Sequence, residues 1–281
     1  PVLLSDLSGN QYYESSALTE NSIFVSFKDN TAGNYDVYGQ HVSFIDGSLL
    51  FGPAGIAIAS GDYDQKSSTL AYNQDQNEVL VCYEVPAGSE TDINCNKIQI
   101  GEQSISETVI ISDNAYNQES PNVYWSGSSY LIVWEDARNS SDNSERDIYF
   151  QEYNNDNFSY PQGGHALSIF DMKQERPLIA KYSDTENSYV ILWEDYRSTG
   201  KEFCANLYGQ SFTSQSCPNL GDMNADSGWN VLDIVLLANC VLAENCTDIT
   251  YGCAGDMNAD GYWNVLDIVL LANCVLAENC G

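Results

Sequence analysis

Basic residues are scarce in this sequence: 10 Lys and Arg stand against 40 Asp and Glu, which gives a formal net charge of −30 at pH 7. The stretch from Glu202 to Gly281 contains no Lys or Arg. A field of this sign attracts neither nucleic acid nor an anionic membrane surface, so we expect neither as a partner. The same charge suits cations such as calcium and a high-salt exterior.

The residues and motifs of common catalytic sites are also missing. There are two histidines, His41 and His165, and neither lies in a nucleophile or metal motif. The sequence has no G-x-S-x-G elbow, no phosphate-binding glycine loop and no H-E-x-x-H pair. These absences predict a protein that is not an enzyme. Acidic residues are numerous, so a glycosidase-like carboxylate pair in the N-terminal part stays open as an alternative.

Long apolar runs are absent as well. No run reaches the ~18–20 residues of a spanning helix, so we expect no membrane span. No signal peptide is present, and we expect the chain from Pro1 to be an already trimmed, mature form. The nine cysteines indicate an oxidising compartment, which favours an extracellular location.

What the sequence does contain is a duplication with an offset of 34 residues: GDMNADSGWNVLDIVLLANCVLAENC from Gly221, and GDMNADGYWNVLDIVLLANCVLAENC from Gly255. Each copy places oxygen-bearing side chains at positions 1, 3, 5, 9 and 12 of a twelve-residue loop, and position 7 offers a backbone carbonyl. This is the ligand spacing of a calcium loop, although Asp/Asn-rich loops are also common turns. The predicted ligands of two Ca²⁺ ions are Asp222, Asn224, Asp226, Gly228, Asn230 and Asp233, and then Asp256, Asn258, Asp260, Tyr262, Asn264 and Asp267.

A calcium loop followed by a helix, without an entering helix and repeated once, resembles the dockerin module of bacterial extracellular multi-enzyme complexes. The resemblance covers about Cys217 to Gly281. It implies a small α-helical pair of half EF-hands that folds with calcium and docks onto a cohesin partner. Dockerins commonly carry small hydroxyl residues at loop positions 10 and 11. Here those positions are Val231-Leu232 and Val265-Leu266, which leaves the identity of the partner open.

The helices predicted over residues 231–245 and 265–279 are apolar almost all the way round. A module of about sixty residues cannot bury two such helices against itself, so another surface must cover part of them. Two covers are open. One is the N-terminal part of the same chain. The other is a second protein, either cohesin-like or another copy of this chain.

The cysteines of the calcium module allow fifteen connectivities. If its two halves pack antiparallel, the pairs are expected to be Cys217–Cys280, Cys246–Cys253 and Cys240–Cys274. In the N-terminal part, a disulfide between Cys82 and Cys95 is expected to staple neighbouring strands. That pairing leaves Cys204 over.

The first ~216 residues repeat a pattern of three short β-runs four times, with Phe27, Cys82, Trp134 and Trp193 as anchors. A fourth short run follows the first three repeats and is missing after the last, whereas PVLLSD at the N-terminus matches it. This predicts a mainly β fold, a four-bladed β-propeller over residues 1–216 whose N-terminal strand closes the last blade. The small helical pair of half EF-hands follows at residues 217–281.

The third and fourth repeats share the motif W-E-D-x-R, which resembles a family of bacterial extracellular β-propeller repeats. The two tryptophans are expected to be blade cores. Arg138 is expected to pair with Glu135 or Asp136, and its counterpart Arg197 with Glu194 or Asp195. Alternatively, these acids and tryptophans line a sugar-binding groove.

Three hypotheses follow for the function of this bacterial, cell-surface or secreted chain. The first is a non-catalytic calcium-binding protein whose dockerin-like module docks a scaffold or binding propeller onto a partner. The second is a self-assembling subunit of a filament or layer, joined by strand addition between propellers. The third is a carbohydrate-binding or glycoside-active propeller attached through its dockerin. We expect the first.

Overall fold

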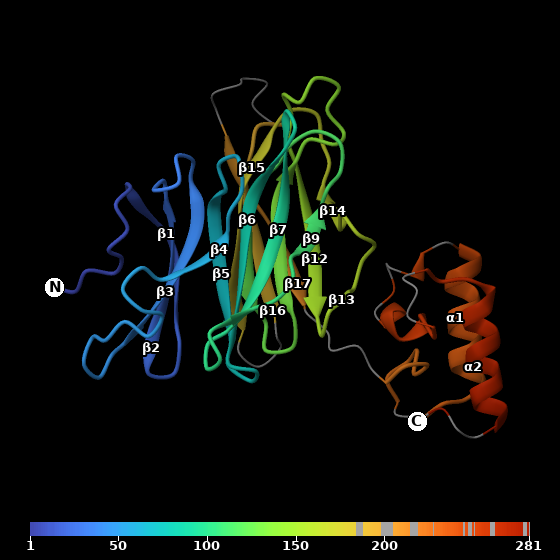
Figure 1. Ribbon diagram of the computed structural model, residues 1–281. Coiled ribbons are helices and arrows are strands. Elements are labelled where there is room, and N and C mark those ends of the chain that lie inside the picture. The colour runs from blue at the N-terminus through green and yellow to red at the C-terminus, as the bar shows by residue number, and fades with distance from the viewer. Residues whose placement is uncertain are drawn as a thin grey trace. The chain divides into compact units, whose positions relative to one another are not determined.

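In the computed structural model, the described residues are 1–183, 188–197, 205–213, 219–226, 228–243, 245–246, 249, 251–258, 262–277 and 280. They form two compact units (Figure 1). One contains residues 1–155 and 162–212, and we call it the β unit. The other contains residues 156–161 and 213–281, and we call it the helical unit.

The β unit consists of four antiparallel sheets. The first runs in the order β1 (Gln11–Leu18), β2 (Ser22–Asp29), β3 (Asp36–Ser43) and β4 (Ile56–Ala59). The second runs β5 (Lys66–Asn73), β6 (Glu78–Ala87), β7 (Glu90–Gln99), with β8 (Ser104–Ile105) and β9 (Val109–Ser112) on β7.

The third sheet runs β10 (Gln118–Trp125), β11 (Tyr130–Asp136), β12 (Asp147–Asn154), with β14 (His165–Ser168) on β12; β13 (Asn157–Phe158) is a two-residue strand after β12. The fourth runs β15 (Gln174–Ser183), β16 (Ser188–Asp195) and β17 (Asn206–Thr213). The prediction of a mainly β fold with a small helical module is confirmed.

The first strands of successive sheets pack beside one another: β5 contacts β1 and β10, and β10 contacts β15. We call β1, β5, β10 and β15 the inner strands. The central strands carry β-branched and aromatic residues that suit a pleated, buried surface. Strand β11 is buried along its whole length, and the fully buried side chains of Leu131, Ile132 and Trp134 form the middle of the third sheet.

Every inner strand carries a β-bulge at the same place. In each sheet two residues of the inner strand stand opposite one aromatic residue of the next strand. The pairs, each opposite its aromatic residue, are Tyr13-Glu14 opposite Phe27, Ser67-Ser68 opposite Tyr83, Ser120-Pro121 opposite Trp134, and Arg176-Pro177 opposite Trp193. The bulge is therefore part of the repeat, and it recurs four times around the β unit.

The strand register corrects one anchor of the predicted repeat. Cys82 pairs with Cys95, as Val133 pairs with Phe150 in the third sheet. Tyr83, one residue later, therefore takes the position of Trp134. The predicted Cys82–Cys95 disulfide is confirmed, and it joins directly opposite residues of β6 and β7. Cys204 lies outside the described residues.

The W-E-D-x-R motif builds a turn that joins neighbouring sheets. Trp134 Nε1 donates to Asp136 Oδ2 over 2.8 Å, and the Arg138 amide and Nε both donate to Asp136 Oδ1 over 2.9 Å. The Arg138 guanidinium also reaches the Gly163 carbonyl at 2.7 Å and Ser112 Oγ at 3.2 Å. Arginine thus pairs with the aspartate of the motif rather than with Glu135. Arg197 repeats the arrangement with Asp195.

The N-terminal segment departs from the prediction. Residues 1–6 form no strand, and β17 is the outer strand of a sheet that has three strands among the described residues. The segment instead lies against the first sheet. The Asp6 amide donates to the Pro53 carbonyl over 3.0 Å, and Gln40 Nε2 donates to the Leu4 carbonyl over 3.0 Å. These hydrogen bonds hold the segment against β3 and the loop before β4, and not beside β17.

The helical unit contains α1 (Val231–Ala243), the short 3₁₀ helix η2 (Gly252–Gly255) and α2 (Val265–Ala277). Leu237 of α1 and Leu271 of α2 are fully buried in one core together with Met223 and Ala254. The opposite faces of the helices are apolar and exposed. Among the described residues, no helix is long and apolar enough to cross a membrane.

The three disulfides predicted for this unit are wrong. Cys240 is bonded to Cys246 and Cys274 to Cys280, and each predicted pair includes one of these four residues. The reason is local. The chain turns back after each helix, which leaves Cα atoms six residues apart at 4.7 Å and 4.8 Å. Cys217 lies outside the described residues.

The staple across β6 and β7 gives a first prediction. Replacing Cys82 and Cys95 together by Ala should lower the free energy of unfolding of the β unit by about 2–4 kcal/mol, because the unfolded chain regains its loop freedom. Urea unfolding followed by the β-sheet circular dichroism signal measures it. The parent chain under reducing conditions should shift in the same way. An unchanged urea midpoint for the double variant would contradict the assignment.

Candidate functional sites

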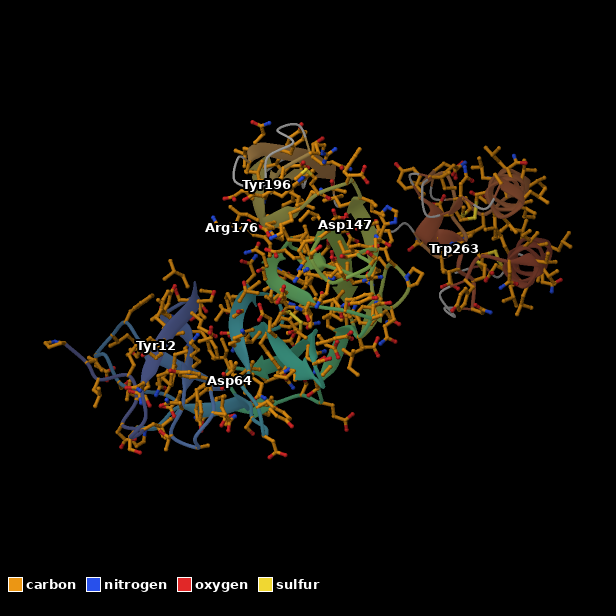
Figure 2. All side chains as sticks on the ribbon, turned by 90° about the horizontal axis from the view of Figure 1, so that it is seen from above. Tyr12, Asp64, Asp147, Arg176, Tyr196 and Trp263 are labelled. Carbon is orange, nitrogen blue, oxygen red and sulfur yellow. A yellow bond between two sulfur atoms is a disulfide. The ribbon has the colours of Figure 1, made fainter. Side chains whose placement is uncertain are left out.

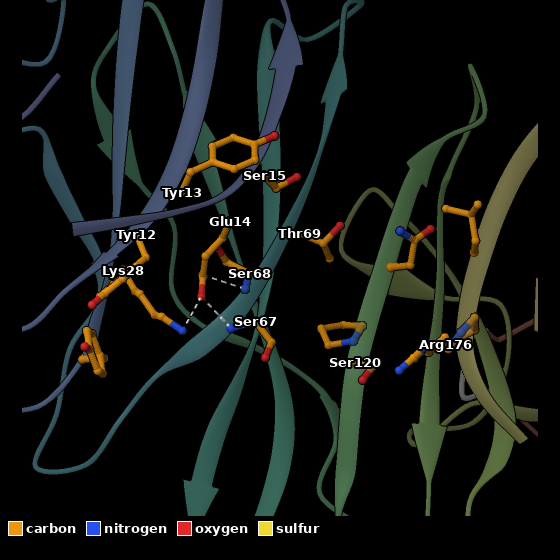
Figure 3. Close-up of a pocket in the computed structure, with 15 residues that line it drawn as sticks. Tyr12, Tyr13, Glu14, Ser15, Lys28, Ser67, Ser68, Thr69, Ser120 and Arg176 are labelled. Carbon is orange, nitrogen blue, oxygen red and sulfur yellow. Dashed lines mark hydrogen bonds and ion pairs between the residues drawn. The ribbon is translucent and has the colours of Figure 1, made fainter. Parts of the chain in front are cut away.

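The four bulges surround one hollow of ≈ 780 Å³, which we call the bulge pocket (Figure 3). Its lining takes three consecutive residues from each inner strand, 13–15, 67–69, 120–122 and 176–178, together with Tyr12, Lys28 and Tyr35. A bulge turns side chains away from the regular alternation of a strand. The four-fold repeat of the bulge therefore creates this hollow at the inner strands.

The side chains that line the bulge pocket are small in its middle and long at its two ends. The second and third sheets contribute small side chains, those of Ser67, Ser68, Ser120 and Pro121. The two end sheets contribute long ones, with Tyr12, Tyr13, Lys28 and Tyr35 from the first and Arg176 from the fourth. Figure 2 labels Tyr12 on the first sheet and Arg176 on the fourth.

The ammonium of Lys28 lies among aromatic rings. Its Nζ is 5.3 Å from the ring centroid of Tyr35 and 5.9 Å from that of Tyr12, within cation–π range. The two tyrosine rings meet edge to face, 5.9 Å apart. This end of the pocket therefore combines two aromatic faces with a positive charge.

Neighbouring sheets are joined by a carboxylate of one sheet that accepts a hydrogen bond from the backbone amide of the bulge in the next sheet. Glu84 Oε1 accepts from the Ser120 amide over 3.0 Å, and Glu135 Oε1 accepts from the Arg176 amide over 2.8 Å. Both donors belong to residues with left-handed φ, 53° and 57°. We call these hydrogen bonds the inter-sheet bonds. Burial raises the pKa of Glu84 and of Glu135.

The first sheet departs from this pattern. Strand pairing places Lys28 where the other sheets have Glu84, Glu135 and Glu194. The bulge residue Glu14 replaces the missing carboxylate. Its Oε1 and Oε2 accept from the amides of residues 67 and 68 over 2.9 Å and 2.8 Å, and Lys28 Nζ lies 3.7 Å from Oε1. Among the described residues, Glu14 is the one carboxylate that lines the bulge pocket.

A second hollow, of ≈ 650 Å³, lies between the third and fourth sheets. Its lining includes Glu119, Glu135, Glu145 and Glu175 beside Arg146 and Lys173. Arg146 holds Glu119 through Nε and Nη2, at 2.9 Å and 2.7 Å. We call it the acidic hollow. Glu135 connects it to the bulge pocket, because its carboxylate bonds the amide of the pocket residue Arg176.

Most of the predicted calcium ligands of the first loop lie close together. The amide of Asp226 donates to both Asp222 Oδ1 and Asn224 Oδ1, at 3.2 Å and 3.0 Å, so these two oxygens share one donor. The amide of Gly228 donates to Asp226 Oδ1 over 2.8 Å. Asp222 is buried, and the unit contains no Lys or Arg to balance it. Buried carboxylates without a positive side chain fit a bound cation.

The ligands predicted at loop positions 9 and 12 also cap the helices. Asn230 Oδ1 accepts from the Leu232 amide over 2.8 Å, while Asp233 Oδ2 accepts from the Asn230 amide over 2.9 Å. The second copy repeats both bonds with Asn264 and Asp267. This is a capping box, and the N-x-x-D spacing in the sequence would have revealed it. Asp233, at position 12, also binds the beginning of the loop, because its Oδ1 accepts a hydrogen bond from the Met223 amide over 2.9 Å.

The second loop is described in part. Asp256, Asn258, Tyr262, Asn264 and Asp267 have described backbones, and Asp260 lies outside the described residues. Asp267 is fully buried, as its counterpart in the first loop is. Within the described parts of both loops, no three acidic, histidine or cysteine side chains gather closely enough to hold a metal by themselves. Asparagine and backbone oxygens would have to complete each ligand set.

The exposed faces of the two helices are the same. Val231 and Leu242 of α1 are 68% and 82% exposed, and Val265 and Leu276 of α2 have the same values. Trp229 does not join this face, because its Nε1 donates to the Leu220 carbonyl over 2.8 Å and its ring packs on the core. Each half of the module therefore offers one identical apolar strip.

This module is a duplicated loop-and-helix calcium domain. Residues 220–276 match the family model described as the dockerin type I domain, and this segment of the chain is a dockerin. Dockerins bind Ca²⁺ and dock onto cohesins, and proteins that carry them are typically extracellular or at the cell surface. A search of curated proteins finds no match to the chain.

The β unit is similar in fold to solved glycoside hydrolases. An endo-arabinase from Bacteroides thetaiotaomicron is 12% identical, with a TM-score of 0.46, over 75% of this chain and 78% of the enzyme. A GH43 endo-arabinanase from Bacillus licheniformis is 12% identical, with a TM-score of 0.44, over 72% and 73%. An α-L-arabinofuranosidase from Fusarium graminearum is 11% identical, with a TM-score of 0.48, over 74% and 65%.

These matches contradict our expectation of a chain that is not an enzyme and whose propeller is a non-catalytic scaffold. They also replace the expected W-E-D-x-R repeat family with a more general propeller fold. A carboxylate pair contributed by separate strands forms no consecutive motif, so the absence of short catalytic motifs was not evidence against an enzyme.

The inter-sheet bonds predict a pH effect. Glu84→Gln should stabilise the β unit at pH 7–8, because burial raises the pKa of Glu84 and the neutral amide still accepts from Ser120. Below the pKa that Glu84 has in the unfolded chain, the stability that its protonated form contributes is complete. It is lost as the pH rises through the higher pKa that Glu84 has in the folded protein. The gain should therefore vanish below about pH 4. Thermal unfolding at both pH values measures it, with the exposed Glu102→Gln as control. A variant less stable at pH 8 than the parent would contradict this reading.

Proposed function

We propose that this protein is a secreted carbohydrate-active enzyme, in which the β unit binds and cleaves a glycan at the bulge pocket and the dockerin tethers it to a cohesin-bearing partner. The observation that carries the proposal is the composition of the pocket. Tyrosine rings stand at one end, an arginine at the other, and hydroxyl and amide groups lie between them. Apolar ring faces with a few placed polar groups are what a sugar requires of its site.

Cleavage of a glycosidic bond needs two carboxyl groups, one of which donates a proton. Glu14 lines the pocket as a carboxylate held by two amides and Lys28. Glu135 lines the acidic hollow and not the bulge pocket, so it is not placed to protonate a glycan bound in the pocket. We therefore assign Glu14 as one of the two carboxyl groups of the reaction. The same carboxylate accepts hydrogen bonds from the amides of residues 67 and 68.

The calcium ligands are part of the same proposal. We assign one ion to each loop, held by the side chains of positions 1, 3, 5, 9 and 12 and the carbonyl of position 7, as predicted from the sequence. The support is the burial of Asp222, Asp233 and Asp267 in a unit without Lys or Arg. Calcium supplies positive charge that lets the loops close, so binding is coupled to the folding of the module.

The exposed strips on α1 and α2 are proposed as the docking face. Leu232 and Leu266, 51% exposed each, stand where dockerins commonly carry hydroxyl residues. The partner surface should accordingly be apolar at these points. We also propose a domain boundary near residue 217, which separates the β unit from the dockerin that attaches it to the partner.

Hydrolysis assays test the catalytic assignment. The calcium-loaded full chain is incubated with arabinan, arabinoxylan and pectic polymers, and released reducing ends are counted. Glu14→Gln should lower the rate about 10²-fold or more, because it removes the carboxylate that lines the bulge pocket. Glu102→Gln is the matched control and should keep full activity. Parent protein that releases nothing from any of these polymers would contradict the assignment.

Calorimetry tests the calcium sites. The parent chain should bind two Ca²⁺ ions, and Asp222→Ala or Asp256→Ala should each leave one, because position 1 supplies a carboxylate that nothing nearby replaces. Asp62→Ala, an exposed acid of the β unit, is the control and should leave two. Either loop variant still binding two ions would show that the ligands are elsewhere.

A further inference from the structure

We infer that the glycan held by the bulge pocket carries a carboxylate, as a uronic acid does, and that Arg176 is the group that receives it. This inference rests on the proposed function and names its substrate class. It starts from the places where the pocket breaks the four-fold repeat. A feature that the fold alone requires should recur in every sheet, so a departure from the repeat points to a ligand.

The first departure is the charge reversal at Lys28. The equivalent residues of the other three sheets are glutamates, and two of them make inter-sheet bonds. A glutamate at position 28 could make the same bond. Instead, a lysine stands there and Glu14 takes over the bond to residues 67 and 68. The exchange adds a positive charge to the pocket without giving up the join between sheets.

The second departure is Arg176. The equivalent bulge residues in the two middle sheets are Ser67 and Ser120, and all three adopt left-handed φ. A long side chain is uncommon in that conformation, and the fold works with serine. The Arg176 side chain is 75% exposed, and its guanidinium pairs with Glu194 through Nη1 at 3.1 Å. Figure 3 shows its side chain across the pocket from Lys28.

An exposed ion pair of this kind contributes little and exchanges readily for another anion. The planar guanidinium offers five donors in a fork that matches a carboxylate, so a ligand carboxylate can be held by two parallel hydrogen bonds. The lining of the pocket holds Lys28 and Arg176 against the single acid Glu14. Each of the two cations has a carboxylate beside it, Glu14 at Lys28 and Glu194 at Arg176, and the exposed pair at Arg176 is the one that a ligand carboxylate can replace.

The presence of two basic residues in one pocket needs an explanation because basic residues are so few. Of the ten Lys and Arg, Arg138 and Arg197 hold the W-E-D-x-R turns and Arg146 holds Glu119. An anion approaching this protein meets repulsion almost everywhere. A pocket lined by two of the ten basic residues is suited to an acidic ligand. We place the sugar rings of that ligand against Tyr12 and Tyr35 and its carboxylate at Arg176.

Calorimetric titration of the calcium-loaded full chain tests the inference. The probes are oligomers of galacturonate, glucuronate and mannuronate, each beside its carboxyl-reduced form. At least one acidic oligomer should bind about tenfold or more tightly than its reduced form, since a hydrogen-bonded charge pair is lost on reduction. Arg176→Gln should remove that preference and leave the affinity for the reduced form unchanged.

The control is Lys173→Gln, which removes the same charge outside the bulge pocket and should keep the preference. Equal binding of acidic and reduced oligomers would overturn this inference while leaving the proposed function intact. So would a preference that survives Arg176→Gln. Binding of neither form, with neutral glycans also failing to bind, would overturn the proposed function and this inference with it.

Discussion

The β unit depends on one interaction, the hydrogen bond from the amide of a left-handed bulge residue to a buried carboxylate of the preceding sheet. Glu84 and Glu135 make this bond to Ser120 and Arg176. Each bond fixes both the spacing of two sheets and the direction in which a bulge faces. Removing a carboxylate would leave a buried amide without its partner, which costs more than the bond contributes. The sheets and the pocket are therefore built by the same contacts.

The proposed ligand contacts lie where the repeat is broken. The second and third sheets have serine and proline at the bulge, and these small side chains leave the middle of the bulge pocket open. The first and fourth sheets have Tyr13 and Arg176 at the same position. The reversal to Lys28 is tolerated because Glu14 replaces the lost acceptor from a neighbouring position. A repeat fold can thus change one end of a site without disturbing the join on which the sheets rely. The dockerin segment follows with two loops and two helices of its own.

The sequence allowed prediction of those features that depend on residues close together in the chain. The duplicated ladder from Asp222 and the β-runs led to the dockerin and to the mainly β unit. It predicted less where the relevant partner is distant in the chain. The bulges were invisible because a bulge is a mismatch between two strands, and the anchor at Cys82 was off by one for the same reason. The helix disulfides were mispaired because the turn after each helix brings nearer cysteines together.

A crystal structure of the calcium-loaded chain with a bound acidic oligosaccharide tests the central claim most directly. The account predicts sugar density in the bulge pocket, with a ring against Tyr12 or Tyr35 and a carboxylate within hydrogen-bonding distance of the Arg176 guanidinium. Density in the acidic hollow or on another surface, with the bulge pocket holding water alone, would contradict it.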